Sequence, residues 1–174
     1  MSDLVAKRPA GNEQVIDEIL ISVIIPIYNA ASFLDTCLKS VERQTFTRYE
    51  VIMVNDGSTD ISQSIAEQFS MKDHRFRLIN LHANRGLPGA RNAGVREAQG
   101  RYILHLDSDD FWLESQTLKV LYTTAELEGT EVLRFNGRNY ENGRLGNAVL
   151  PSFNAVNIEL QSNRALWIFR SVFL

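Results

Sequence analysis

The sequence has only one cysteine, Cys37, so no disulfide can form within the chain. Disulfides are typical of secreted proteins, and their absence fits a reducing cytoplasm. A lone cysteine outside any metal-binding or catalytic pattern is more typical of a small core residue than of a nucleophile. We therefore expect Cys37 to be buried and the protein to be cytoplasmic.

Excess positive charge is also lacking. Lys and Arg total 18 against 21 Asp and Glu, which gives a net charge of −3. Domains that bind nucleic acids usually carry a basic patch or stripe. This charge balance therefore argues against a nucleic-acid partner.

Long apolar runs are missing as well, since none approaches the roughly 18 residues of a membrane-spanning helix. Residues 1–20 lack the apolar core of a signal peptide. Residues 1–18 are polar, which predicts a flexible N-terminal segment. The remaining chain suits one domain of ordinary size, because 44% of the 174 residues are apolar.

Several catalytic signatures are absent. No His/Cys group has the spacing of a zinc site, and there is no G-x-S-x-G elbow. There is also no lysine-containing phosphate loop and no G-x-G-x-x-G after the first predicted strand. These absences disfavour zinc, serine-hydrolase, P-loop and dinucleotide-binding functions.

The chain does contain a regular alternation of buried strands and amphipathic helices. Such alternation, with connections too long for hairpins, predicts an α/β fold whose sheet is mainly parallel and flanked by helices. A turn-rich segment, 136–147, predicts a hairpin, and the apolar segment 164–174 predicts a helix. Strands are expected at 21–29, 50–55, 76–81, 101–106 and 130–135, and helices at 32–44, 60–69, 87–99 and 115–129.

Polar residues follow each of the first four predicted strands. In a parallel sheet these positions meet at one edge, where ligands usually bind. Pro26 lacks an N–H donor, so we expect ladder pairing of the first strand to stop there. The polar groups are Tyr28 and Asn29, then 55–60, then His82 with Asn84 and Arg85, and finally 107–110.

Some of these residues have simple structural explanations. Tyr28 could be a half-buried packing residue, and Thr59 and Asp60 are expected to cap the following helix. Asp56 is left unexplained by capping.

Arg91 is predicted in the first turn of helix 87–99, where a cation opposes the helix dipole, so we expect an anion nearby.

The segment DSDD places Asp107, Asp109 and Asp110 within four residues. Crowded carboxylates repel one another unless a cation lies among them. Oxygen ligands of this kind suit Mg²⁺ or Mn²⁺, usually together with substrate phosphates. We therefore expect a divalent cation at this segment.

Four segments in this order and spacing closely resemble family 2 glycosyltransferases of the GT-A fold. They are SVIIPIYN, VIMVNDGSTD, NRGLPGARNAG and YILHLDSDDFW, and the resemblance covers about 21–135. It implies a nucleotide-diphosphate sugar donor, usually a UDP-sugar, and transfer with inversion at the anomeric carbon. The implied acceptor is a saccharide or a lipid-linked glycan, which would allow a peripheral position at the inner face of the membrane.

The resemblance also implies roles for individual residues. Tyr28 matches the residue beside the nucleobase, and Asp56 the carboxylate that hydrogen-bonds uracil. Arg85 and Arg91 match the stretch near the phosphates. Asp107 and Asp109 match the Asp-x-Asp pair, with Asp109 the direct metal ligand and Asp107 supporting it. The matched motifs also contain the further expected substrate-binding residues Pro26, Asn29, Asn84 and Ser108.

The catalytic base is not identified. In the family it usually lies in a later Glu-Asp motif, and nothing in 137–174 matches it; Glu141 and Glu159 are the carboxylates in this region. The resemblance therefore implies a donor-binding core at 19–136 and an incomplete acceptor-side region at 137–174. The apolar 164–174 segment would then be an interior piece, able to mediate self-association.

Two other functions share part of this pattern. A nucleotide-sugar-binding module without catalysis fits the same motifs. A response-regulator-like domain also clusters carboxylates at strand ends, but it would need an acidic pair after the first strand and a lysine after the fifth. Tyr28-Asn29 and Asn136-Gly137 stand there instead, which disfavours that class.

Overall fold

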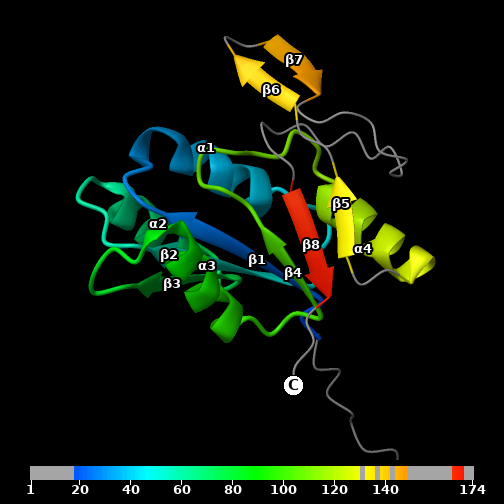
Figure 1. Cartoon of the computed structure of the whole chain (residues 1–174), viewed down its shortest axis with the longest axis horizontal. Helices are drawn as coiled ribbons and strands as arrows, with labels where there is room; N and C mark the ends of the chain where they lie inside the picture. The colour runs from blue at the N-terminus through cyan, green and yellow to red at the C-terminus, as the bar shows by residue number, and fades with distance from the viewer. Residues whose placement is uncertain (1–17, 130–131, 136–137, 142–143, 149–165, 171–174) are drawn as a thin grey trace, which may run out of the picture.

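Continuous apolar runs form the strands at the centre of the molecule, because side chains on both faces of these strands are buried. The computed structural model describes residues 18–129, 132–135, 138–141, 144–148 and 166–170. Four parallel strands lie in the order β3-β2-β1-β4 (Figure 1). Their bounds are β1 Ile21–Ile27, β2 Tyr49–Asn55, β3 Phe76–Asn80 and β4 Tyr102–His105.

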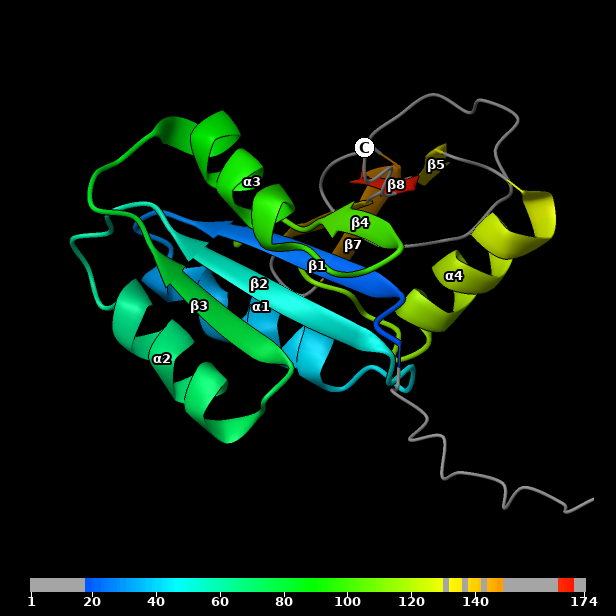
Figure 2. The same ribbon diagram turned by 90° about the horizontal axis from the view of Figure 1, so that it is seen from below.

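Helices cover both faces of this sheet, as Figure 2 shows with α1 and α2 on one face and α3 on the other. Alternate residues of one strand serve the two faces: Val23 and Ile25 belong to the core cluster that includes α1, whereas Ile24 packs with Ala90 and Ala93 of α3. The predicted α/β fold with a mainly parallel sheet is confirmed. The helices are α1 Ala31–Glu42, α2 Ser62–Lys72, α3 Gly86–Glu97 and α4 Thr117–Glu128.

Pro26 lies in the part of β1 that extends beyond its pairing with β4. The register of β1 with β4 ends at Ile24, but its register with β2 continues through Pro26 to Ile27. The Ile24 carbonyl accepts from the Leu106 N–H, which follows β4, and the Ile27 carbonyl accepts from the Asp56 N–H, which follows β2. Because backbone groups alternate between the two sides of a strand, the Pro26 nitrogen is on the β4 side, beyond the last β1–β4 pair. Pairing therefore extends one residue beyond the predicted stop, since the missing N–H points away from β2.

The helix predicted over 164–174 is wrong for its described part, which is strand β8, Leu166–Arg170. β8 lies between β4 and β5, Val132–Phe135, and is antiparallel to both. Trp, Ile and Phe favour strands, and a short apolar run does not distinguish a buried strand from a helix by periodicity. Pairing with β4 and β5 decides the conformation, and β8 completes a six-stranded sheet. Self-association through this segment stays a prediction.

The predicted hairpin is confirmed: β6, Arg138–Glu141, pairs antiparallel with β7, Arg144–Ala148, in a separate two-stranded sheet. The ring of Tyr140 in β6 meets the ring of Phe111 edge-on, with 5.2 Å between centroids. The predicted flexible segment 1–18 lies outside the described residues apart from Glu18. Within the described ranges, no helix has the length and apolar character needed to cross a membrane.

Candidate functional site

A cleft of about 330 Å³ opens at the carboxyl ends of the parallel strands. This size lies at the lower end of the range for small-molecule sites. The loops after β1, β2, β3 and β4 all contribute to its walls. Of the predicted site residues, it is lined by Pro26, Tyr28, Asn29, Asp56, Asn84, Asp107, Ser108 and Asp109, but not by Arg85 or Arg91.

Asp56 connects the loop after β2 to the loop after β3. Its carboxylate is buried, and Oδ1 accepts from the Arg85 backbone N–H at 2.7 Å. The next residue, Gly57, has φ +72, and a Cβ there would lie 3.1 Å from the Asn84 backbone nitrogen. A side chain at position 57 would therefore be strained and crowded. Arg85 thus contributes a backbone amide here, outside the cleft lining.

The two predicted helix caps behave differently. Asp60 lies one residue before the N-cap position of α2, Ile61, and its Oδ1 accepts from the backbone N–H of Ser62, so it satisfies a free amide of the first turn as predicted. Thr59 does not cap α2. Its Oγ1 and its backbone N–H both donate to Asn29 Oδ1, at 3.2 and 2.8 Å.

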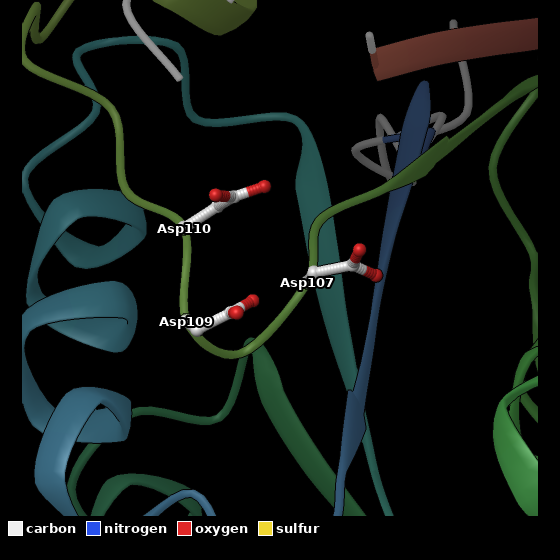
Figure 3. Close-up of side chains that lie close together, drawn as sticks. All are labelled: Asp107, Asp109 and Asp110. Atoms are coloured by element: carbon white, nitrogen blue, oxygen red, sulfur yellow. The ribbon is translucent and has the colours of Figure 1, made fainter. Parts of the chain in front are cut away.

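Three carboxylates lie together in the loop after β4. Asp107, Asp109 and Asp110 each offer an oxygen, and these atoms lie within 4.8 Å of one another. In Figure 3 the side chains of Asp109 and Asp110 point toward the arm of the loop that carries Asp107. This all-oxygen donor set fits a hard divalent cation such as Mg²⁺ or Mn²⁺. Asp110 is thus a third possible ligand besides the two predicted ones.

Arg91 is near an anion, as predicted, but that anion is Asp107 of the protein itself. Arg91 Nη2 donates to Asp107 Oδ1 at 2.6 Å. The predicted place of Arg91 in the first turn is wrong, because α3 begins at Gly86 and Arg91 lies in its second turn. Nearby, burial and the Arg91 charge lower the pKa of His105 to about 4.

Cys37 of α1 lies beneath the acidic loop. It is fully buried, as predicted, and its thiol donates to the Asp107 carbonyl at 3.6 Å. Burial raises the pKa of this thiol well above its ordinary value, and the charges of Asp110, Asp109 and Asp107 raise it further. Cys37 is therefore an unreactive packing residue.

The chain after the acidic loop is anchored by α1. Trp112 is 1% exposed, and its backbone N–H donates to Ser40 Oγ at 3.1 Å. Arg43 donates through Nη2 to the carbonyl of Trp112 and, at 2.8 Å, to that of Leu113. Because both ends of the loop are held, the three carboxylates have a fixed backbone frame.

Two exposed apolar side chains at the cleft were missed. Helical spacing alone places Phe33 beside the apolar stripe of the predicted helix 32–44, but Phe33 is 57% exposed and lines the cleft. Leu87 at the start of α3 is 44% exposed and lines it too. The buried stripe of α1 consists of Leu34, Cys37, Leu38 and Val41, with Phe33 at its margin. The sequence signal for this exposure is the position of Phe33, an aromatic residue at the edge of the apolar stripe and close to the polar residues that follow β1.

Among the described residues that line the cleft, no general base is identified. Glu141 ends β6, and Glu159 lies outside the described residues.

Comparison with protein families adds an independent observation. The family model described as "Glycosyl transferase family 2" matches residues 22–169. Among curated proteins, glycosyltransferase GlyA of Streptococcus pneumoniae is 44% identical over 102 residues, covering 59% of this chain and 14% of GlyA. Glycosyltransferase GlyG of the same organism is 38% identical over 122 residues, covering 70% of this chain and 40% of GlyG.

Among solved structures, TarS of S. aureus in complex with UDP aligns with a TM-score of 0.64 at 32% identity. The alignment covers 72% of this chain and 37% of the TarS chain. The TarS complex with UDP-GlcNAc gives a TM-score of 0.65. This chain thus spans less than half the length of these relatives.

Proposed function

The chain belongs to glycosyl transferase family 2 and has the GT-A fold, and on this basis we propose that it binds a nucleotide-diphosphate sugar, a UDP-sugar, for glycosyl transfer. The observation that carries the proposal is that one cleft is lined both by Tyr28 and Asp56 and by the carboxylates Asp107 and Asp109. A nucleotide diphosphate has the matching chemistry: a planar base at one end and a chelating anion at the other.

The base end of the donor is assigned to Tyr28 and Asp56. Tyr28 is 52% exposed at the cleft, so its ring is accessible for stacking. Asp56 accepts from the Arg85 amide, and its carboxylate also lines the cleft, where it can accept from a uracil N–H. The choice of uracil is supported by TarS, a relative at 32% identity that was solved with UDP.

The diphosphate end is assigned to the acidic loop, with Asp109 as the direct ligand of Mn²⁺ or Mg²⁺ and Asp107 supporting it. When bound, the cation would stabilise the negative charge that develops on the leaving diphosphate. Arg91 contributes by holding Asp107 in place. Asn84, Ser108 and Pro26, the last near the end of β1, also line the cleft and complete the donor site.

Transfer with inversion also requires a base that deprotonates the acceptor hydroxyl. The acceptor of the proposed reaction is a saccharide or a lipid-linked glycan, handled in the cytoplasm or at the inner face of the membrane. This chain supplies the donor site, and the base belongs to the acceptor side of the reaction.

Calorimetry with UDP, GDP and dTDP, each with and without Mn²⁺, tests the proposal. UDP should bind most tightly, and Mn²⁺ should increase its affinity. Equal, weak binding of all three nucleotides would contradict a donor site. Because no base is identified in the described part of the chain, UDP binding with little or no sugar transfer is the expected result here. A longer form of the protein that binds UDP equally well and still transfers no sugar would instead favour a non-catalytic nucleotide-sugar-binding module.

A further inference from the structure

Asn29, which lines the cleft, has an unusual backbone conformation. Its φ is +50, and within the described residues every other positive φ belongs to a glycine. This left-handed region is sterically unfavourable for residues with a Cβ, although Asn tolerates it better than most. Unfavourable conformations at a cleft persist where surrounding contacts enforce them, and they often have a functional reason.

The side chain of Asn29 shows what enforces the conformation. Asn29 Oδ1 accepts from the backbone N–H of Thr59 at 2.8 Å, from Thr59 Oγ1 at 3.2 Å and from the Asp60 N–H at 3.3 Å. In return, the Asn29 N–H donates to Ser58 Oγ at 3.1 Å. One asparagine thus joins the loop after β1 to the loop after β2 through both its backbone and its side chain.

The first residues of α1 strengthen this connection. The Ala30 N–H donates to Ser62 Oγ at 2.9 Å, and the Ala31 N–H donates to Asp60 Oδ2 at 3.1 Å. The backbone amides of Ala30 and Ala31 therefore have acceptors in the side chains of Ser62 and Asp60, at or just before the start of α2. Most of the polar side chains of residues 58–62 are used to join two loops, which explains their density without a ligand.

The two joined loops carry the residues assigned to the nucleobase. Tyr28 directly precedes Asn29, and Asp56 lies two residues before Ser58. Both line the cleft, so their separation depends on how the two loops are held together. The Asp56 N–H also donates to the Ile27 carbonyl at 2.8 Å, but this contact joins only the ends of β2 and β1 and not the loops beyond them.

We propose that Asn29 is a positioning residue for donor recognition: it acts through Tyr28 and Asp56, fixing the gap into which the base enters, instead of binding the donor directly. This inference rests on the proposed function for its ligand, but the connection between the loops can be measured without any ligand.

Three substitutions separate the properties of Asn29. Asn29→Gly keeps the positive φ but removes the acceptor oxygen. Asn29→Asp keeps the positive φ and the acceptor oxygen, and the N-termini of α1 and α2 favour its added charge. Asn29→Ala removes the acceptor oxygen and also disfavours the positive φ. Gln68→Ala, at an exposed position on α2, the helix that follows the loop contacted by Asn29, is the control.

Hydrogen exchange of the Thr59 and Asp60 amides and calorimetry with UDP are the two measurements. Asn29→Gly should speed exchange at both amides and weaken UDP binding about tenfold, because the gap between the loops is no longer fixed. Asn29→Asp should restore slow exchange and most of the affinity, measured in low and high salt to screen the new charge. Gln68→Ala should match the parent in both measurements. If Asn29→Ala fails to fold, Asn29→Gly alone decides the question.

Parent-like UDP affinity in Asn29→Gly, despite faster exchange, would overturn the proposal. So would an equal loss of affinity in Asn29→Asp and Asn29→Gly at both salt concentrations, because that pattern indicates direct binding through the side-chain amide. If the parent itself binds no UDP, the proposed function fails, and Asn29 is then a structural connector without a role in donor recognition.

Discussion

Arg91 on α3 and Asp107 in the loop after β4 form an ion pair with 2.6 Å between Nη2 and Oδ1. The Asp107 side chain is only 11% exposed, whereas that of Arg91 is 35% exposed. The pair attaches the acidic loop to α3, on one face of the sheet. On the opposite face, the Cys37 thiol of α1 donates to the backbone carbonyl of Asp107. Asp107 is therefore held from both sides of the sheet.

Replacing Arg91 with methionine should lower the free energy of unfolding by about 1–3 kcal/mol, because a nearly buried carboxylate loses its charged donor. Urea unfolding of the parent, Arg91→Met, Asp107→Asn and the double variant measures the coupling between the two residues. We expect the double variant to be less destabilised than the sum of the single changes. Strict additivity would contradict a direct interaction.

Replacing Asp109 with asparagine should weaken Mn²⁺ binding in the presence of UDP by more than about tenfold, because the exposed member of the acidic cluster is removed. Thermal unfolding with UDP, with and without Mn²⁺, reports the loss. Asp35→Asn is the matched control: it removes an exposed carboxylate on α1 that pairs with Lys39, away from the cleft. An Asp109→Asn protein with the same Mn²⁺ response as this control would refute the metal assignment.

Replacing Asp56 with alanine should weaken UDP binding about ten- to a hundredfold, the usual effect of losing a charge-assisted hydrogen bond. Asp56→Asn separates two roles, because it keeps an acceptor for the Arg85 amide but loses the charge. Calorimetry should therefore show weaker binding for both variants, and urea unfolding should show greater destabilisation for alanine. Unchanged UDP affinity in both would rule out the base contact, and a parent that prefers GDP would rule out uracil.

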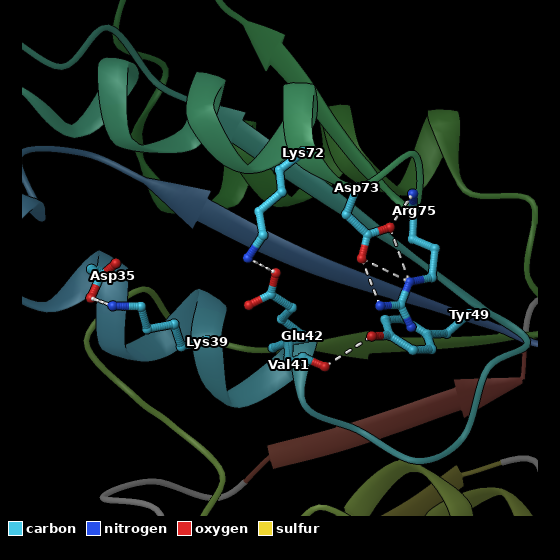
Figure 4. A network of polar contacts seen from close by, with 8 residues as sticks. All are labelled: Asp35, Lys39, Val41, Glu42, Tyr49, Lys72, Asp73 and Arg75. Carbon is cyan, nitrogen blue, oxygen red and sulfur yellow. Dashed lines mark hydrogen bonds and ion pairs between the residues drawn. The ribbon is translucent and has the colours of Figure 1, made fainter.

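Tyr49 should make stability fall at alkaline pH. Its ring is buried, its hydroxyl donates to the Val41 carbonyl at 2.9 Å, and Arg75 lies over the ring, 4.6 Å from its centroid (Figure 4). Burial raises the pKa of Tyr49 from 10.0 to about 12. Between these values the unfolded chain loses the phenolic proton while the folded protein keeps it, so stability falls as pH rises through this window.

Tyr49→Phe should cost about 1 kcal/mol at neutral pH through the lost hydrogen bond. The stability advantage of the parent over Tyr49→Phe should then shrink and reverse between pH 10 and 12, because only the parent has this ionisation. Urea unfolding at several pH values measures both curves. A constant difference across that range would mean that Tyr49 ionises at the same pH in the folded and unfolded chains.

Much of the fold could be predicted because local patterns and tertiary contacts agree. The four parallel strands are continuous apolar runs, and the loops after them carry polar residues that the sheet necessarily brings to one edge. The acidic loop is the clearest case, since Asp107, Asp109 and Asp110 are close in sequence and remain close in space.

The failures have a common physical cause, which is dependence on distant partners. Leu166–Arg170 is a strand only because β4 and β5 lie on either side of it. Arg91 meets a carboxylate 16 residues away in sequence, on another element. Thr59 prefers the oxygen of Asn29 to the amides of its own helix. Local capping and helix rules contain no information about such partners.

The place of β8 in the sheet has a consequence for how the protein is made. β1 to β4 can pair as soon as they leave the ribosome, but β4 acquires its second neighbour only when residues 166–170 have been synthesised. Until then the outer edge of β4 has unpaired backbone groups, and β5 has no strand beside it. Open edges of this kind can pair with other chains. Nascent chains stalled between β5 and β8 should therefore be the ones that need chaperone protection.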